Sequence, residues 1–356
     1  MAESTYDIKR AIRAVVDGQE LSAEEAAGAM NAIMGGEVSG AQIGALVTSL
    51  RMRGETVEEI AGFARAMRSH ALKVEVDAGL GPILDTCGTG GDAAGTFNIS
   101  TTASFVIAGA GVRIAKHGNR AASSRCGSAD VLEGLGVRIE LSPEQVADCV
   151  ARVGIGFMYA PAFHPAMRFV GPARREIGIR TVFNVLGPLT NPAGAQYQLI
   201  GVGHPEIARK LAKVLALLGS QRAILVHAAE GLDEIGISGP TQITDFDARS
   251  GRISTYDIRA EDFGLMPGTR ADITGGEVAE NVEITRSVLR GERGPRRTIT
   301  VLNAAAGIYA ANAVDNLAAG IRLAEAAIDS GAAFEKMQAL IEVTQSLTTE
   351  QIEVSA

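Results

Sequence analysis

The sequence predicts an α/β protein in which a small all-helical domain precedes a large domain with a mostly parallel central sheet. The initial seventy-odd residues carry apolar side chains at helical spacing, and no alternating strand pattern interrupts them. From about residue 80, short strand-like runs alternate with glycine turns and helix-like runs, which is typical of a parallel sheet covered by helices. The 356 residues, of which 46% are hydrophobic, can bury a large core and correspond to about two domains.

Four helices are expected before residue 75. Apolar residues from Ile8 to Val15 follow helical spacing. Each of the next three helices opens with a capping box, in which serine or threonine is followed three residues later by glutamate or glutamine. These pairs are Ser22 with Glu25, Ser39 with Gln42, and Thr56 with Glu59.

Six later segments are expected to be strands, because each is a short apolar run close to a turn or a helix-like stretch. They are Ile83–Thr86, Val112–Lys116, Val137–Leu141, Ile155–Tyr159, Gln198–Val202 and Ala223–His227. Helical stretches are expected between them at Ser100–Ala110, Ala129–Leu135, Pro143–Val153 and Pro205–Leu218. The runs Thr241–Phe246 and Arg252–Tyr256 flank a turn and indicate a hairpin added to the sheet. Residues Asn303 to Gln345 are alanine-rich and are expected to be helical.

One segment, from Phe163 to Pro192, breaks the strand–helix alternation and is rich in proline and arginine. We expect it to cross back to the helical domain and to line a cleft there, because binding clefts prefer domain boundaries. The predicted domains are therefore residues 1–75, completed by about 166–194, and a large α/β domain of residues 76–165 and 195–356.

Composition excludes several classes of function. The net charge of -8 argues against a nucleic-acid-binding protein, which normally presents a basic face. The N-terminus lacks an apolar signal-peptide core. The longest uncharged, mostly apolar stretch, Ala103 to Val112, is too short to span a membrane. Three cysteines without metal-ligand spacing favour a reduced, cytoplasmic setting.

Two glycine-rich loops lie about two dozen residues apart, each after a strand-like run and before a helix-like one. The first is Asp85 to Asp92 and the second is Lys116 to Ser124. Loops in this position expose backbone N–H groups and helix N-termini, which bind phosphate. An ordinary tight turn is the alternative for the first loop, which matches neither the dinucleotide fingerprint nor the Walker sequence. The second loop combines two cations, an imidazole, an amide and two hydroxyls, which favours an anion or substrate site.

Three further groups could take part in chemistry. Asn98 to Thr102 offers an amide and hydroxyls at a helix start, where they could cap the helix, hold phosphate oxygens, or do both. The adjacent carboxylates Asp233 and Glu234 suit magnesium, although an exposed acidic turn is the common alternative. A polyphosphate beside an acidic site requires an intervening cation, which favours the metal. Arg174 and Arg175 could bind a carboxylate or a phosphate in bidentate fashion, or form surface salt bridges.

Over nearly its whole length the chain resembles the anthranilate phosphoribosyltransferase family, which catalyses the second step of tryptophan biosynthesis. The resemblance is carried by a series of short motifs in a fixed order. They are Gly88-Thr89-Gly90-Gly91-Asp92, Asn98-Ile99-Ser100-Thr101, Lys116-His117-Gly118-Asn119-Arg120, Cys126-Gly127-Ser128-Ala129-Asp130-Val131-Leu132-Glu133, His164-Pro165-Ala166-Met167, Arg180-Thr181-Val182-Phe183-Asn184, Gly187-Pro188-Leu189-Thr190-Asn191-Pro192 and Gly231-Leu232-Asp233-Glu234. Cys126 and Phe163 stand where many relatives carry serine and histidine.

The resemblance implies the fold of the nucleoside phosphorylase and phosphoribosyltransferase class, a homodimer formed through the helical domain, and transfer of a phosphoribosyl group to anthranilate. It assigns binding of 5-phosphoribosyl 1-pyrophosphate to Gly88, Gly91, Asp92, Thr96, Asn98, Ile99, Ser100, Thr101, Lys116, His117, Gly118, Asn119, Arg120, Ala121, Ala122, Ser123, Ser124 and Ser128. It assigns anthranilate contacts to Gly88, Asn119 and Arg174, and Mg²⁺ binding to Ser100, Asp233 and Glu234. No strong general base is expected, because an aniline nitrogen is nucleophilic without prior deprotonation, and His117 is the only candidate considered.

Two other functions remain open at this point. A pyrimidine nucleoside phosphorylase shares the architecture and a related lysine–serine loop, but the pair Asp233-Glu234 and the His164-Pro165-Ala166-Met167 stretch favour the transferase. A non-catalytic, nucleic-acid-binding relative would require a basic surface, whereas this chain is acidic.

Overall fold

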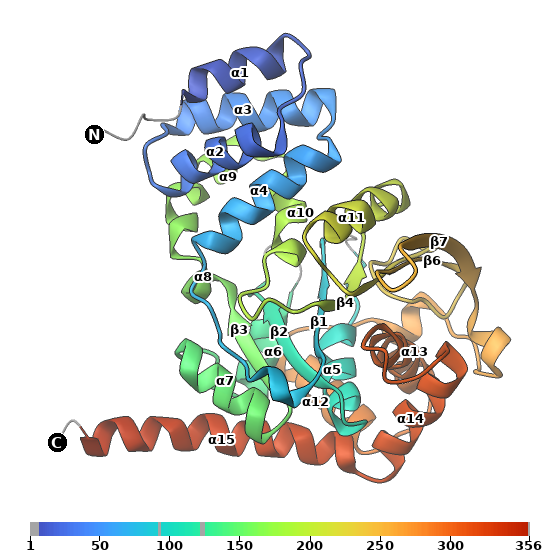
Figure 1. Cartoon of the computed structure of the whole chain (residues 1–356). Coiled ribbons are helices and arrows are strands. Elements are labelled where there is room, and N and C mark those ends of the chain that lie inside the picture. Colours follow the sequence, from blue (N-terminus) through green and yellow to red (C-terminus); the bar gives the residue numbers. More distant parts are fainter. Residues whose placement is uncertain (1–6, 92–93, 122–124, 355–356) are drawn as a thin grey trace.

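The computed structural model describes residues 7–91, 94–121 and 125–354, with side chains as far as Leu347. Helices α1 to α4 lie together at one end of the molecule, beside α9 and α10 (Figure 1). The sheet lies below them, and the long helix α15 runs along the opposite side. This arrangement confirms the predicted fold class, a helical part followed by an α/β part with a mostly parallel sheet.

The four predicted N-terminal helices are all present. They are α1 (Ile8–Val16), α2 (Ala23–Met34), α3 (Gly40–Arg53) and α4 (Val57–Ser69). All three predicted capping boxes form, with both reciprocal hydrogen bonds in each. Helices α2 and α4 pack closely because Gly62 has no side chain; a Cβ there would lie 2.2 Å from the carbonyl oxygen of Ala23.

A fully buried carboxylate, that of Glu59, joins the helical part internally. It accepts hydrogen bonds from the backbone N–H of Leu21 at 2.9 Å and of Thr56 at 2.8 Å. It also pairs with the guanidinium of Arg53, which in turn donates to the carbonyl of Gln19. One side chain therefore ties together the α1–α2 connection, the end of α3 and the start of α4.

The sheet contains seven strands in the order β3-β2-β1-β4-β5-β6-β7. They are β1 (Ile83–Gly88), β2 (Arg113–Gly118), β3 (Ile155–Tyr159), β4 (Tyr197–Gly201), β5 (Arg222–Ala228), β6 (Thr241–Asp247) and β7 (Arg252–Ile258). The first five are parallel, and β6 and β7 form the predicted antiparallel hairpin. Because β2 and β4 pair with opposite edges of β1, the strand order reverses between β1 and β4, and ligands commonly bind at such a reversal.

The predicted strand at Val137–Leu141 is wrong. This segment has no regular secondary structure and belongs to no strand of the described sheet. Its side chains at 137, 139 and 141 are buried, which explains the alternating pattern. Its backbone meets a helix instead of a strand, since the N–H of Arg138 donates to the Thr344 hydroxyl at 3.1 Å.

The helices of the α/β part mostly follow the prediction. The four predicted ones are α5 (Ile99–Gly109), α6 (Ser128–Leu135), α7 (Pro143–Arg152) and α11 (Pro205–Leu217). The C-terminal region forms α12 (Val278–Leu289), α13 (Pro295–Ala310), α14 (Leu317–Asp329) and α15 (Ala332–Val354). The alanine-rich stretch is thus three helices, separated where Asn312 and Gly331 adopt positive φ. Among the described residues, no helix is long and apolar enough to cross a membrane.

The segment from Phe163 to Pro192 crosses back to the N-terminal helices, as expected. It forms α8 (Ala160–Phe163), α9 (Gly171–Ile177) and α10 (Phe183–Leu186), together with short 3₁₀ turns. Helix α9 packs on α3, and α10 packs on α4. Its residues Val170 and Phe183 are buried in the same apolar cluster as the N-terminal helices. This packing supports the predicted domain division, which remains a prediction.

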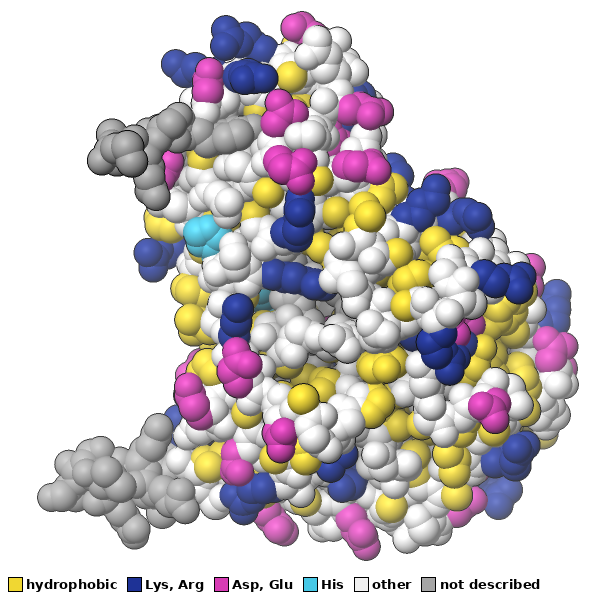
Figure 2. Space-filling view, viewed as in Figure 1, with side chains coloured by type: hydrophobic (Ala, Val, Ile, Leu, Met, Phe, Trp, Pro, Cys, Tyr) yellow, Lys and Arg dark blue, Asp and Glu magenta, His cyan; other side chains and the backbone are white. Residues whose placement is uncertain are grey.

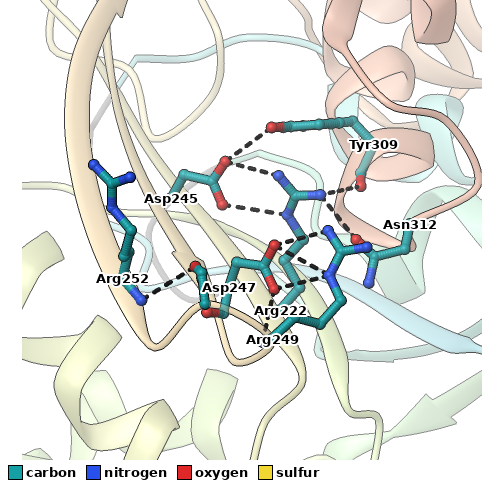
Figure 3. A network of polar contacts seen from close by, with 8 residues as sticks. Arg222, Asp245, Asp247, Arg249, Arg252, Tyr309 and Asn312 are labelled. Atoms are coloured by element: carbon teal, nitrogen blue, oxygen red, sulfur yellow. Dashed lines mark hydrogen bonds and ion pairs between the residues drawn. The ribbon is translucent and has the colours of Figure 1, made fainter.

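A buried ion pair fastens the hairpin to the helical layer. Arg222, at the start of β5, pairs with Asp245 of β6 at 2.8 Å and stacks 3.7 Å from the ring of Tyr309 on α13 (Figure 3). The Tyr309 hydroxyl donates to Asp245 at 3.1 Å, and Asn312 accepts from Arg222 at 2.8 Å. Both charges of this pair are therefore hydrogen-bonded, by the end of α13 and by the residue Asn312 just after it, which offsets the cost of burying them.

The Glu59 contacts predict a stability effect confined to the helical part. Glu59→Gln removes the charge that balances Arg53, and we expect it to lower the free energy of unfolding by roughly 2–4 kcal/mol. The matched control is Glu58→Gln, an exposed glutamate one position earlier on the same helix. Urea unfolding followed by circular dichroism measures both. Equal midpoints for the two variants would contradict this account of Glu59.

Candidate functional site

A cavity of about 960 Å³ opens at the carboxyl ends of β1 and β2, between the sheet and the N-terminal helices. Residues of both glycine-rich loops, the acidic pair and the crossing segment line it. On the face shown in Figure 2, Lys and Arg side chains lie along the boundary between the helical part and the larger part below. The cavity therefore lies where the strand order reverses, with positively charged side chains at its edge.

The first glycine loop is held by the end of β4. The Thr89 N–H donates to the carbonyl of Gly201 at 2.9 Å, and the Thr89 hydroxyl accepts from the N–H of Gly203 at 3.1 Å. Gly90 and Gly91 both have positive φ, a conformation that favours glycine. The loop thus follows directly from the end of β1 and rests on the end of β4.

The acidic pair faces this loop. An Asp233 carboxylate oxygen accepts from the Gly90 N–H at 3.1 Å, and a Glu234 carboxylate oxygen accepts from the Ser100 N–H at 3.2 Å. The second contact places a negative charge at the N-terminus of α5, where the helix dipole stabilises it. Both acids and Ser100 line the cavity.

Ile235, the residue after the acidic pair, is held by the buried side-chain amide of Asn303. Asn303 of α13 accepts from the Ile235 N–H at 2.9 Å and donates to the Ile235 carbonyl at 3.0 Å. Asn303 is fully buried. The acidic turn is therefore attached to the C-terminal helices on one side and to the glycine loop on the other.

A buried lysine lies beneath the cavity. The ammonium group of Lys116, on β2, donates to the carbonyl and hydroxyl of Thr86 and lies 3.4 Å from the Ser100 hydroxyl. Burial lowers the pKa of Lys116, and the charge of Asp85 opposes that shift. Burial in turn raises the pKa of Asp85, which accepts from the His117 N–H at 3.1 Å. Opposite charges thus lie side by side on β1 and β2, directly below the two loops.

The second loop is organised by the start of α6. The Asp130 carboxylate accepts from the N–H groups of Ala121 and Gly127, at 2.9 and 2.8 Å, and so holds both ends of the loop. Arg120 pairs with Asp130 at 3.1 Å and with both carboxylate oxygens of Glu133, at 2.6 and 2.9 Å. These hydrogen bonds, that to Glu133 first, raise the pKa of Arg120. Two carboxylates therefore neutralise the charge of Arg120 in this structure.

Two histidines lie in the cavity wall. The rings of His117, on β2, and His164, after α8, are 5.0 Å apart, and both residues are more than nine-tenths buried. Burial lowers the pKa of His117 to about 3, with a further contribution from His164, and lowers the pKa of His164 to about 4. Both imidazoles are neutral at neutral pH, so His117 is a weak base.

The crossing segment forms the wall opposite the loops. Arg174 lies 5.6 Å from the centre of the Phe183 ring, and burial lowers the pKa of Arg174. Met67 of α4, Met167 and Pro188 add apolar surface beside it. A flat apolar ring carrying an anionic group matches this wall chemically.

Most of the predicted site residues come together in this one cavity. Those that line it are Gly88, Asn98, Ser100, Thr101, Lys116, His117, Gly118, Asn119, Arg120, Ser128, Arg174, Asp233 and Glu234. Among the described residues, Gly91, Thr96, Ile99 and Ala121 lie outside its lining. Asp92, Ala122, Ser123 and Ser124 are not among the residues that the structure describes. The assigned roles remain predictions for all of them.

The sequence interpretation gave no site role to several residues that line the cavity. They include Met67, His164, Arg168, Phe183 and Pro188. Most belong to the crossing segment, for which a cleft was predicted without naming the lining side chains. His164 and Phe183 stand in two of the motifs that carry the resemblance. Whether their side chains line the cavity, however, depends on how the crossing segment packs on α4.

The described residues contain no group of three or more His, Cys, Asp and Glu that could hold a metal by themselves. Asp233, Glu234 and the Ser100 hydroxyl nevertheless supply hard oxygen donors within one cavity. Magnesium is usually bound by one or two carboxylates together with substrate phosphates and water. The residues present therefore fit magnesium bound together with a phosphorylated ligand.

Two family models match the chain. The a/b domain of a glycosyl transferase family matches residues 80–334, and the helical bundle domain of the same family matches residues 9–71. These ranges correspond to the sheet part and to helices α1 to α4.

Known proteins match over nearly the full length. The chain is 54% identical to an anthranilate phosphoribosyltransferase of Herpetosiphon aurantiacus, covering 95% of this chain and 99% of that one. The crystal structure of the Thermus thermophilus anthranilate phosphoribosyltransferase matches with a TM-score of 0.89 at 42% identity, covering 94% and 99%. The Saccharomyces cerevisiae enzyme, in complex with PRPP and Mg, matches with a TM-score of 0.87 at 28% identity, covering 96% and 99%. None of these matches supports the nucleoside phosphorylase or nucleic-acid-binding alternatives.

The buried histidines predict a pH dependence of stability. Their folded pKa values lie below the ordinary value of 6.5, so the unfolded chain takes up protons first as the pH falls. Their contribution is present above about pH 6.5 and is lost progressively toward pH 4 and 3. Between pH 7 and 5, each should reduce the free energy of unfolding by about 2 kcal/mol. Urea unfolding at both pH values measures it, with His117→Asn/His164→Asn as the comparison. If that variant loses as much stability as the unaltered chain, the histidines are not responsible.

Proposed function

The chain belongs to the anthranilate phosphoribosyltransferase family, and from this we propose how its cavity binds the two substrates of the reaction. The reaction transfers the phosphoribosyl group of 5-phosphoribosyl 1-pyrophosphate (PRPP) to the amine of anthranilate. It yields N-(5-phosphoribosyl)anthranilate and pyrophosphate, in the second step of tryptophan biosynthesis. The observation that carries the proposal is the meeting of two glycine loops, an acidic pair and an arginine-bearing apolar wall in one cavity.

PRPP is placed on the sheet side of the cavity. The first glycine loop and the N-terminus of α5 present backbone N–H groups there, which suit the pyrophosphate. Asn98, Ser100 and Thr101 add an amide and hydroxyls at the start of α5. The second loop, Lys116 to Ser124, and Ser128 at the start of α6 are proposed to bind the rest of the same substrate. Because Asp130 and Glu133 already balance the charge of Arg120, the loop contributes hydrogen-bond donors more than net positive charge.

Anthranilate is placed against the crossing segment. Arg174 is half-buried there and would pair with the carboxylate, since guanidinium binds carboxylates in bidentate fashion. Phe183, Met67 and Pro188 would pack on the aromatic ring. Gly88 and Asn119, which belong to the two loops and line the same cavity, would lie near the amine, which must approach the anomeric carbon of the ribose.

Catalysis in this arrangement is positioning and stabilisation of charge. The amine displaces pyrophosphate at the anomeric carbon, and positive charge develops on the sugar as negative charge develops on the leaving group. The first glycine loop is held in place by the end of β4, which limits the movement of the loop as that charge grows. His117 is too weak a base to take the amine proton before attack, and an aniline nitrogen requires no such base.

Magnesium is proposed as the cofactor, held by Asp233, Glu234 and the Ser100 hydroxyl. Bound magnesium would neutralise part of the charge on the leaving pyrophosphate. The chain contributes the position of both carboxylates, through the Gly90 and Ser100 N–H groups and through Asn303. The yeast relative in complex with PRPP and Mg supports this proposal.

A homodimer formed through the helical part is also proposed. Val16 on α1 and Met52 on α3, exposed by 65% and 84%, are apolar side chains that such an interface would cover. Sedimentation analysis tests the dimer, because a monomer mass would reject it.

The three free cysteines support action in the reducing cytoplasm.

Anthranilate fluorescence tests the function directly. Adding PRPP and magnesium to the protein with anthranilate should make the fluorescence fall as product forms, and omitting any one component should stop the change. Persistent fluorescence with folded protein and all components present would reject the proposed function.

Removing the charges of the acidic pair, Asp233 and Glu234, is predicted to abolish most of the activity. Asp233→Asn together with Glu234→Gln keeps the shape of both side chains and their backbone contacts but removes the charges that hold magnesium. We expect turnover to fall at least about a thousandfold, the scale of removing charge stabilisation from an active site. Circular dichroism checks the fold, and Glu261→Gln, an exposed acid outside the cavity, is the control. Near-normal rates at limiting magnesium would reject the metal role.

Removing the Arg174 side chain is predicted to weaken the binding of anthranilate but not of PRPP. Arg174→Ala should raise the KM for anthranilate by about tenfold or more and change the KM for PRPP little, because only anthranilate has a carboxylate at this wall. Arg290→Ala is the matched control, since Arg290 lies 5.4 Å from the ring of Phe334 but outside the cavity. Steady-state kinetics separate the two constants. Equal increases in both would show that Arg174 does not bind the carboxylate.

A further inference from the structure

Asn281, on α12, is a buried amide to which neither the motifs nor the proposed mechanism gives a role. Its side chain is 1% exposed, and it lies 183 residues from its partner Asn98 in the sequence. It does not line the cavity, whereas Asn98 does. A buried polar side chain so close to the PRPP residues requires an explanation, because burial without hydrogen bonds would destabilise the fold.

Three hydrogen bonds form a continuous series from Gly276 through the amides of Asn281 and Asn98 to Cys126. The Gly276 N–H donates to Asn281 Oδ1 at 2.9 Å, and Asn281 Nδ2 donates to Asn98 Oδ1 at 3.0 Å. Asn98 Nδ2 then donates to the carbonyl of Cys126 at 3.1 Å. Because each amide donates at one end and accepts at the other, the orientation of Asn281 determines the orientation of Asn98.

The three bonds connect parts of the site that are distant in sequence. Asn98 is the N-cap residue of α5, so it immediately precedes Ser100 and Thr101. Cys126 lies just before Gly127 and Ser128, where the second loop enters α6. The segment that carries Gly276 also pairs with the approach to α5, through Phe97 N–H to Ile273 and Gly275 N–H to Gly95. The end of the second loop is thus bonded to Asn98 at the start of α5, and Asn98 is in turn bonded to Asn281 on α12.

We propose that Asn281 is a positioning residue that sets the spacing between the two PRPP-binding loops. It acts through Asn98 and does not touch the substrate. This inference rests on the proposed function, because it assigns Asn98 and both loops to PRPP. It predicts that loss of the Asn281 amide weakens PRPP binding selectively and leaves anthranilate binding nearly unchanged.

The test uses two variants of the full chain and one control. Asn281→Leu is close in size but removes both hydrogen bonds, and Asn281→Ser leaves room for water if the leucine variant does not fold. Thr285→Val is the matched control. Thr285 lies one turn later on α12, is fully buried, and bonds to Thr102 of α5 at 3.1 Å, outside the three-bond series.

Titration calorimetry with PRPP and magnesium, steady-state kinetics and thermal unfolding are measured for all three. We expect both the Kd and the KM for PRPP to rise by about tenfold in the Asn281 variants, the size of effect that a lost buried hydrogen bond produces. The KM for anthranilate should change less than about twofold. Thr285→Val should leave both KM values within about twofold, even where it lowers the unfolding temperature as much.

Three outcomes overturn the inference while the unaltered chain binds PRPP. One is unchanged PRPP binding in the Asn281 variants, another is an equal rise of both KM values, and the third is a matching PRPP defect in Thr285→Val. Failure of the unaltered chain to bind PRPP would instead reject the proposed function, so the two failures are distinguishable.

Discussion

The close packing of the acidic turn on glycines at the ends of β1 and β4 is the constraint on which the site depends. A Cβ at Gly201 would lie 1.6 Å from the Asp233 carbonyl oxygen, and one at Gly88 would lie 2.8 Å from the Asp233 carboxylate. Only glycine at these positions lets a turn after β5 reach over β4 to the loop after β1. The carboxylates, the loop N–H groups and the start of α5 meet because of this approach.

The same site is supported from behind by buried amides. Asn303 holds the acidic turn through Ile235, and Asn281 holds the start of α5 through Asn98. Both come from the C-terminal helices, which do not line the cavity. The chemistry is therefore carried by loops, whereas their relative positions are set by fully buried hydrogen bonds on rigid helices, where a polar group left without a partner would be costly.

The helical part contributes the second wall and depends on different interactions. Glu59 joins the α1–α2 connection to the α3–α4 connection, and the crossing segment is buried against α3 and α4. The cavity lies between this part and the sheet, and its histidines are desolvated by both. Burial explains why His117 is neutral and a weak base, which agrees with a reaction whose nucleophile needs no deprotonation.

The sequence by itself predicted most of the helices and strands and many of the residues that line the cavity, because capping boxes, apolar runs and glycine loops are local signals. It failed at Val137–Leu141, whose alternating burial is identical to that of a strand but faces α15. It also gave no role to His164 or Asn281. Whether a histidine faces a cavity, or an asparagine bonds to one 183 residues away, depends on which elements pack together. Only the tertiary structure decided these contacts, since they arise between segments that no local pattern relates.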